Sequence, residues 1–346
     1  MASIGAVRHR PPTTTGAVSR MASWISRESA ADNLWWGVTY GNDLFVAVGS
    51  FGTIRTSPTV MTSPNGITWT SQSSAADNVW YSVGFFVAVS SYGTNHVMTS
   101  PDGINWTGRT AATDNAWTSV TYGNSIFVAV SINSGTTNSV MTSQDNTYGK
   151  GIFVAVSYGI TWISWVSAAD NDWRSVTFGN STFVAVGEYG TVMTSPDGNY
   201  WTSRTVATYN DWYSVTYGNS IFVAIGEGGT VMTSDGNYWT SRTAATDNDW
   251  NSVTYGGGFF VAVGSPDSSE MGNCVMTSSD GIVWTSRASA ANNSWYSVTY
   301  GNGIFIAVSS TGMGNRVMTS PDGIEWTSRV SAADNNWRSV TYGDGI

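Results

Sequence analysis

Four short apolar runs, separated by turn residues, form a unit that recurs along the chain. In the copy that begins at Trp295 the runs are Trp295–Tyr300, Ile304–Val308, Val317–Thr319 and Trp326–Ser328. The tryptophans that open successive copies are 37 to 45 residues apart, except for one gap of 56 residues. Apolar runs of this length, bounded by Gly, Asn, Ser and Pro, are typical of β-strands. The pattern therefore predicts an all-β repeat protein with four strands in each unit.

The turns and the second apolar run refine this prediction to a β-propeller of four-stranded antiparallel blades. Residues 300–303 read Tyr-Gly-Asn-Gly and residues 255–258 read Tyr-Gly-Gly-Gly, which accept the positive φ angles of a tight hairpin. The Phe-Val-Ala-Val run is apolar on both faces of its strand, as expected when a sheet packs between two neighbours. A four-stranded repeat near 40 residues is the signature of a propeller blade. A right-handed parallel β-helix is the alternative, although its coils are shorter and lack a tight antiparallel hairpin.

The number of blades follows from counting repeated positions. Eight tryptophans begin first strands, and eight others mark fourth strands, from Trp24 to Trp326. We favour an eight-blade register, with seven blades as the alternative. Because propellers close by pairing strands from both chain ends, we expect Trp24 to join the last unit, which begins at Trp337 and lacks its second and third strands. The shortened second unit and the fused units near residue 150 predict one or two thin or distorted blades.

A repeated turn, Ser-Pro-Asp-Gly-x-x-Trp, joins the third and fourth strands. Its aspartate can accept backbone hydrogen bonds, its glycine can adopt a left-handed conformation, and its tryptophan can cover the turn. Asn65 replaces the aspartate in the first copy, and the copy at Ser234 is one residue shorter. We expect these aspartates to be structural: Asp102, Asp197, Asp235, Asp280 and Asp322.

This turn, together with Trp-x-Ser-Val-Thr-Tyr-Gly and Phe-Val-Ala-Val in fixed order, resembles the Asp-box or bacterial neuraminidase repeat. That repeat occurs in sialidases, in photosystem II assembly propellers, and in bacterial and phage proteins of unknown role. The resemblance covers nearly all of residues 24–346. It implies that the aspartate turns lie on the face opposite a ligand site.

Composition and charge narrow the possible partners. The 346 residues carry a net charge of −9. Nucleic acids and anionic membranes require a basic surface, so neither is expected as a main partner. Cys274 is the only cysteine, and His9 and His96 are the only histidines, so no metal site or cofactor is predicted.

The sequence also predicts how the chain is divided. Residues 1–21 lack periodicity and contain Pro11-Pro12 and a threonine run, which indicates a disordered leader. Residues 22–346 are expected to form one propeller domain, with C-terminal truncation left open. Neither a secretory signal nor a membrane-spanning run is recognisable. The location is therefore left open between the cytoplasm and a larger extracellular particle.

Candidate binding residues lie in the loops that lead into each first strand, which we call the inter-blade loops. They read Ser-Ala-Ala-Asp-Asn-x-Trp or a close variant. Carboxylates and amides hydrogen-bond sugar hydroxyls and indoles stack on sugar rings, but the same residues could instead cap turns and pack between blades. A cation such as Ca²⁺ is a weaker alternative because no compact acidic loop is present. The candidates are Asp32, Trp35, Asp77, Trp80, Asp114, Trp117, Asp170, Trp173, Asp247, Trp250, Asp334 and Trp337.

These features predict a non-enzymatic propeller that presents repeated weak sites to a glycan or a protein. The loops between second and third strands vary most among the units, so they are the other place for recognition. A structural component of a phage tail or a bacterial surface appendage is the alternative. A sialidase-like glycoside hydrolase is disfavoured, because its Arg-Ile/Leu-Pro motif is absent and most arginines are spread over fourth strands. Those arginines are Arg204, Arg242, Arg287 and Arg329.

Overall fold

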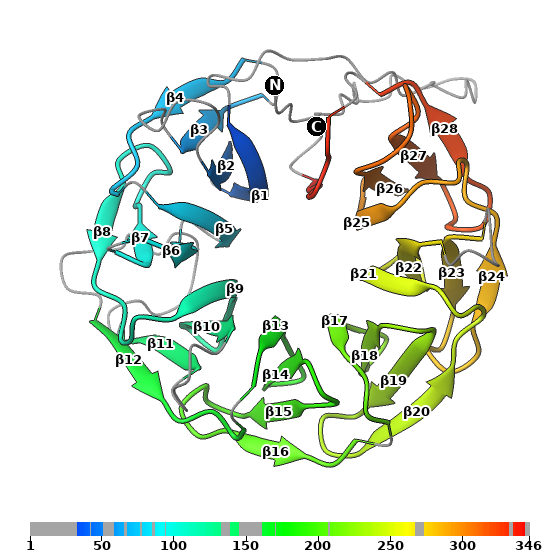
Figure 1. Cartoon of the computed structure of the whole chain (residues 1–346), viewed down its shortest axis with the longest axis horizontal. Helices are drawn as coiled ribbons and strands as arrows, with labels where there is room; N and C mark the ends of the chain where they lie inside the picture. Colours follow the sequence, from blue (N-terminus) through cyan, green and yellow to red (C-terminus); the bar gives the residue numbers. More distant parts are fainter. Residues whose placement is uncertain are drawn as a thin grey trace, which may run out of the picture.

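The computed structural model describes residues 33–342, apart from 42, 51–58, 66–67, 77, 85–86, 94, 133–138, 145–160, 170, 207, 267–272 and 332–334. In this part of the chain, 28 β-strands form seven four-stranded antiparallel sheets and there is no helix. No described residue therefore belongs to a helix able to cross a membrane. The sheets stand in a ring, like the blades of a propeller (Figure 1). The all-β propeller prediction is confirmed, and the β-helix alternative is wrong.

Each sheet is one blade, numbered 1 to 7 in chain order, and its four strands lie in order from the ring centre outward, with the first strand innermost (Figure 1). The first strands are β1 (Leu34–Gly41), β5 (Val79–Gly84), β9 (Ala116–Gly123), β13 (Trp173–Gly179), β17 (Trp212–Gly218), β21 (Asp249–Gly256) and β25 (Trp295–Gly301). The second strands are β2 (Leu44–Ser50), β6 (Val87–Tyr92), β10 (Ile126–Ile132), β14 (Thr182–Gly187), β18 (Ile221–Gly226), β22 (Phe259–Ser265) and β26 (Ile304–Ser309).

The outer half of each blade is shorter. The third strands are β3 (Val60–Ser63), β7 (Val97–Thr99), β11 (Val140–Gln144), β15 (Val192–Ser195), β19 (Thr230–Ser234), β23 (Val275–Ser278) and β27 (Val317–Ser320). The fourth strands are β4 (Thr70–Gln72), β8 (Thr107–Arg109), β12 (Thr161–Trp165), β16 (Thr202–Arg204), β20 (Trp239–Thr243), β24 (Thr285–Arg287) and β28 (Thr327–Arg329).

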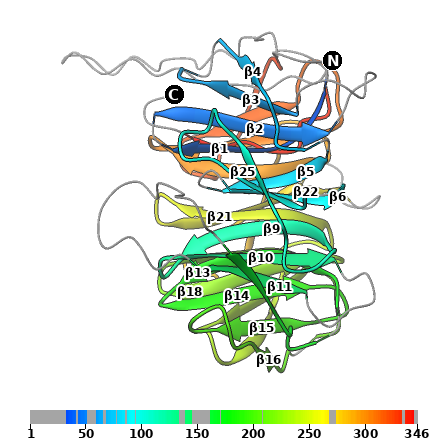
Figure 2. The ribbon, with the colours of Figure 1, turned by 90° about the vertical axis from the view of Figure 1, so that its left-hand side faces the viewer.

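The strands run roughly along the ring axis, so their connections lie on two faces (Figure 2). Because neighbouring strands are antiparallel, the first hairpins and the aspartate turns share one face, which we call the turn face. The inter-blade loops and the loops between second and third strands, here the 2–3 loops, share the opposite face. We call this second face the loop face.

In blades 3 to 7 the first hairpin closes through two residues with positive φ. In blade 5 these are Asn219 at 44° and Ser220 at 65°, between the paired residues Gly218 and Ile221. Two positive φ angles define the hairpin turn whose twist matches that of the strands it joins. Asn and Gly tolerate this conformation, which explains the repeated Tyr-Gly-Asn pattern.

The core lies between blades, not within them. One cluster joins Val223, Ile225 and Val231 of blade 5 to Trp250 and Phe260 of blade 6. Second strands are buried on both faces, as the Phe-Val-Ala-Val run predicts. Each blade therefore completes the core of its neighbour, and a single blade has no closed core of its own.

The first strands are joined around the ring by two further contacts that repeat from blade to blade. The backbone N–H of Val253 donates to Ser214 Oγ at 3.3 Å, and Val298 donates to Ser252 in the same way at 3.2 Å. The ring of Tyr255 covers Gly218, where an added Cβ would lie 2.2 Å from the tyrosine ring. This position needs glycine because the next blade occupies the space a side chain would fill.

The segment 337–342 occupies the first-strand position of an eighth blade. Trp337 packs on Val308 and Val317 of blade 7, and the N–H of Val340 donates to Ser297 Oγ at 3.3 Å, as in the other blades. In Figure 1 this segment, coloured red, points into the ring between β25 and β1. Arg338 continues the ring to blade 1, since its guanidinium carbon lies 4.0 Å from the centre of the Tyr296 ring and 5.8 Å from that of Trp36.

Seven complete blades thus fit the ring, and the eighth position of the predicted register holds a first-strand segment. The expected partner strand at Trp24, like the leader 1–21, lies outside the described residues. The shortened second repeat and the fused repeat each form a sheet of four strands, so neither blade lacks a strand. In blade 3 the fourth strand is β12, which pairs with β11 and comes from the end of the fused unit.

Alanine at Gly218 tests the contact between first strands. We expect Gly218→Ala to lower the free energy of unfolding by about 1–3 kcal/mol, because the new methyl group overlaps the Tyr255 ring. Gly41 is the matched control, since an added Cβ there has nothing within 4 Å. Urea unfolding followed by tryptophan fluorescence measures both variants, and an equal loss in both would contradict the packing role.

Candidate functional site

A β-bulge interrupts the first strand of every blade, at the residue after its opening tryptophan. In blade 4, for example, Trp173 and Ser175 are paired to neighbouring residues of β14, which leaves Arg174 unpaired between them. Bulges re-aim side chains, and here they lie where the first strands meet the loop face. We call these residues the rim residues: Trp36, Tyr81, Thr118, Arg174, Tyr213, Asn251, Tyr296 and, in the eighth position, Arg338.

The rim is asymmetric, and one part of it is aromatic. The rings of Trp36 and Tyr81 are stacked with centroids 5.0 Å apart and planes 20° apart. Arg338 lies between Trp36 and Tyr296, so four consecutive positions form one continuous row. The indole N–H of Trp36 donates to Ser50 Oγ at 3.1 Å, which fixes the ring in place. We call this row the aromatic sector.

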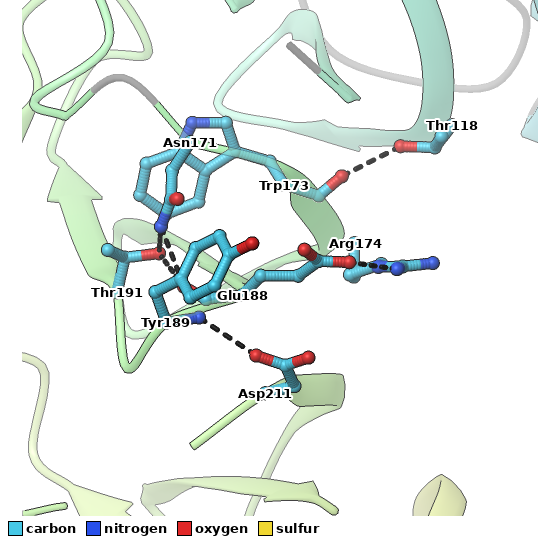
Figure 3. Close-up of polar contacts among 8 residues, drawn as sticks. All are labelled: Thr118, Asn171, Trp173, Arg174, Glu188, Tyr189, Thr191 and Asp211. Carbon is cyan, nitrogen blue, oxygen red and sulfur yellow. Dashed lines mark hydrogen bonds and ion pairs between the residues drawn. The ribbon is translucent and has the colours of Figure 1, made fainter. Parts of the chain in front are cut away.

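Three of the four remaining rim residues, Thr118, Arg174 and Asn251, make polar contacts with the next blade or with their own 2–3 loop. Thr118 Oγ1 donates to the Trp173 carbonyl at 2.9 Å, and Asn251 Nδ2 donates to the Trp295 carbonyl at 2.9 Å. Arg174 forms an ion pair with Glu188 (Figure 3). The polar groups of these three side chains are therefore engaged within the propeller.

Carboxylates dominate the loop face around Tyr213. Burial raises the pKa of the Tyr213 phenol, and the negative charges of Glu227, Asp249 and Asp211 raise it further. The three carboxylates therefore act on one region of blades 5 and 6. No group of three or more metal-ligating side chains capable of holding an ion is found among the described residues.

The predicted tryptophan candidates are part of the core. Trp80, Trp117, Trp173 and Trp250 are fully buried, and Trp35 and Trp337 are at most 8% exposed. A buried indole has no free face on which a sugar could stack. Any ligand contact at the inter-blade loops must therefore come from the residues around these tryptophans.

The predicted aspartates are placed less uniformly. Asp32, Asp77, Asp170 and Asp334 lie outside the described residues. Asp114 is exposed and its Oδ1 lies 2.7 Å from Nε2 of His96, which belongs to the 2–3 loop of blade 2. Asp247 is exposed on the loop before blade 6. The structure therefore brings Asp114 and Asp247 to the loop face but does not join them into one site.

The asparagine next to each aspartate has the structural role that sequence reasoning missed. Asn248 is buried and its Nδ2 donates to the Asn273 carbonyl at 2.6 Å, and Asn293 Nδ2 donates to the Asn315 carbonyl at 2.9 Å. Each bond ties an inter-blade loop to the 2–3 loop of the same blade. The signal was present, because an asparagine precedes the opening tryptophan by two residues in all eight units, whereas the aspartate varies.

All five turn aspartates are engaged by their own turns. Asp280 Oδ1 accepts hydrogen bonds from the N–H groups of Ile282 at 2.8 Å and Val283 at 3.0 Å. Trp284 Nε1 donates to the Gly281 carbonyl at 2.9 Å, so the indole covers the turn. The same pair of backbone bonds is made by Asp102, Asp197, Asp235 and Asp322.

Comparison with known proteins identifies a fold. No family model and no curated protein matches the sequence. YCF48 from Cyanidioschyzon merolae is 13% identical over 83% of this chain and 95% of that chain, with a TM-score of 0.56. The computationally designed protein Ika8 is 10% identical over 92% of this chain and 81% of its own, with a TM-score of 0.52. A structure of YCF48 bound to a D1 peptide matches 64% of this chain and 69% of that chain at 15% identity and a TM-score of 0.45. The first two likenesses show that the chain shares their propeller fold.

The aspartate turns predict a dependence of stability on pH. Hydrogen bonds from the N–H groups of Val283 and Ile282 lower the pKa of Asp280. The N–H group of Ile324 is the main cause of the lowered pKa of Asp322. A carboxyl whose pKa is lower in the folded state stabilises the fold at pH values above its unfolded pKa of about 4, and this contribution is lost as the pH falls further.

We therefore expect the double variant Asp280→Asn, Asp322→Asn to show a shallower loss of stability than the original protein between about pH 5 and pH 2. The reverse change, Asn65→Asp, should steepen that loss, because it adds a titratable carboxyl where Asn65 Oδ1 accepts the Thr68 N–H at 3.1 Å. Urea unfolding at a series of pH values measures both. Parallel curves for all three proteins would refute this role of the turn carboxylates.

Proposed function

We propose that the protein is a non-catalytic binding or assembly module whose loop face recognises a protein partner. The observation that carries this proposal is the location of the differences between blades. The repeated Trp, Ser, Val, Tyr and Gly positions are used in packing between blades. The rim residues and the 2–3 loops differ from blade to blade and share one face. Variable residues on a rigid scaffold are the usual place of recognition.

The chemistry of the aromatic sector favours a protein as the ligand. Tryptophan, tyrosine and arginine are the residues that contribute most often to binding energy at protein interfaces. Trp36, Tyr81, Tyr296 and Arg338 place these three types in one row. Tyr81 is 36% exposed, so its ring is available to a partner.

The asymmetry of the rim favours one composite site over a set of identical weak sites. Repeated glycan binding would use the opening tryptophans, whose faces the core already covers. A glycan therefore remains the second candidate ligand, reached through the exposed rim residues. As a structural component of a phage tail or a surface appendage, the protein would use the same face for a permanent neighbour.

Selection of displayed linear peptides against the whole chain tests this proposal. We expect selected peptides to lose about 30-fold in affinity on Tyr81→Ala, because a partly exposed aromatic at an interface contributes about 2 kcal/mol. Tyr238→Ala is the matched control, since Tyr238 is an exposed tyrosine on the turn face. Its affinity should not change.

Two outcomes would contradict the proposal. One is the absence of any peptide that binds through the loop face. The other is binding that Tyr238→Ala weakens and Tyr81→Ala does not. A glycan array probed in parallel with the same two variants would identify a sugar ligand, if glycans bind with the Tyr81 dependence and peptides do not.

A further inference from the structure

Two exposed tyrosines lie side by side on the loop face between blades 4 and 5. Tyr189 is 56% exposed and belongs to the 2–3 loop of blade 4, and Tyr209 is 76% exposed and belongs to the inter-blade loop before blade 5. Their ring centroids are 6.2 Å apart, with the planes tilted by 41°. We call them the tyrosine pair. They lie outside the aromatic sector.

The backbone holds the two loops together beneath the tyrosine pair. Gly190 N–H donates to the Asn210 carbonyl at 2.7 Å, and Tyr189 N–H donates to Asp211 Oδ1 at 2.9 Å (Figure 3). An added Cβ at Gly190 would lie 2.9 Å from the Thr208 carbonyl oxygen, so the loops touch backbone to backbone. The two rings therefore project from a fixed platform.

The junction between blades 5 and 6 has the same framework without the tyrosines. Gly229 N–H donates to the Asn248 carbonyl at 2.9 Å, and Gly228 N–H donates to Asp249 Oδ1 at 3.0 Å. Gly228 and Asp247 stand there in the places of Tyr189 and Tyr209. Since the framework forms equally well with Gly and Asp, the tyrosine pair is not needed to build it.

Tyr189 also adopts a backbone conformation that disfavours its side chain. Its φ is +53°, and Gly228 has +58° at the corresponding place. Glycine adopts this left-handed region freely, whereas a tyrosine there is strained. The ring is thus present at an exposed position despite a local penalty, and strained residues of this kind cluster at binding sites.

The surroundings of the tyrosine pair are strongly negative. Among the described residues of the rim, the inter-blade loops and the 2–3 loops of blades 4 to 6, Arg174 is the one cation, and it is paired with Glu188. The acidic residues of the same loops are Asp172, Glu188, Asp211, Glu227, Asp247 and Asp249. A partner surface that meets the tyrosine pair would be complementary if it were positively charged.

We propose that the tyrosine pair binds a lysine or arginine side chain of the protein partner, which rests on the proposed function of the loop face. A cation placed over the face of a tyrosine is attracted by the ring electrons, and two tilted rings can hold one cation between them. The surrounding carboxylates strengthen the attraction and exclude acidic side chains. The tyrosine pair thereby sets the charge of the residue that docks between blades 4 and 5.

Peptides selected on the whole chain, as described for the proposed function, provide the probe. We expect them to be enriched in Lys or Arg at one position. Replacing that residue by norleucine in a synthetic peptide should weaken binding about 5- to 30-fold, the loss expected for a cation held by two aromatic faces. Tyr209→Ala and Tyr189→Gly should each weaken the cationic peptide and leave the norleucine peptide unchanged.

Tyr189→Gly keeps the test independent of folding. The substitution places at position 189 the glycine that occupies the corresponding position 228, and it relieves the strain because glycine tolerates a positive φ. The melting temperature of this variant should therefore equal or exceed that of the original protein. Tyr189→Phe keeps the ring and should keep the affinity. Tyr238→Ala, on the turn face, should change neither affinity nor the preference for a cation.

The results separate this inference from the proposed function. Peptides that depend on Tyr81 but show no preference for Lys or Arg, and no effect of Tyr189→Gly, would overturn the inference and leave the proposed function standing. Full retention of affinity by the norleucine peptide would also overturn it, since the tyrosine pair would then hold an apolar group. A selection that yields no peptide for the loop face would overturn both.

Discussion

From blade 2 to the eighth position, the indole of the opening tryptophan packs into the sheet of the preceding blade, and the second strand of that sheet is buried on both faces. Trp250 against Val223 and Ile225 is one instance, and Trp337 against Val308 is the last. Each blade thus shares its core with a neighbour, so the packing of one blade depends on the blade beside it. The glycine beneath each inner tyrosine and the hydroxyl that accepts the next valine N–H depend on this spacing between sheets.

The same dependence explains the segment at the eighth position. Residues 337–342 make the tryptophan, valine and tyrosine contacts of a first strand, although no described second strand pairs with them. The contacts between blades are therefore the same at this position as in the complete blades. Arg338 lies between Tyr296 of blade 7 and Trp36 of blade 1, and its cation–π contacts connect this segment to both blades.

A ring made of near-copies leaves few residues free to differ. Core positions are tied to two blades at once, so a change there affects both. The rim residues and the 2–3 loops lie outside these buried clusters, although Thr118 and Asn251 also bond to the next blade, and the bulge after each tryptophan turns its variable side chain to the loop face. Differences in charge and aromatic content between blades therefore accumulate on one face, where they can form a single composite surface.

The sequence by itself determined the blade. Its apolar runs, hairpin glycines and aspartate turns act over a few residues, so spacing alone revealed the strands, the register of eight positions and the bonding of Asp280 within its turn. Only the tertiary structure decided which repeated residues face solvent. Trp173 and Asn248 belong to the loops that the sequence suggested for ligand binding, but both are buried, because a neighbouring sheet or loop covers them. Sequence periodicity reports the face of a strand and not what lies against it. The tyrosine pair and the aromatic sector could not be foreseen for the same reason: their members are separate in sequence and meet only when neighbouring blades pack together or, for Arg338 and Trp36, when the ring closes.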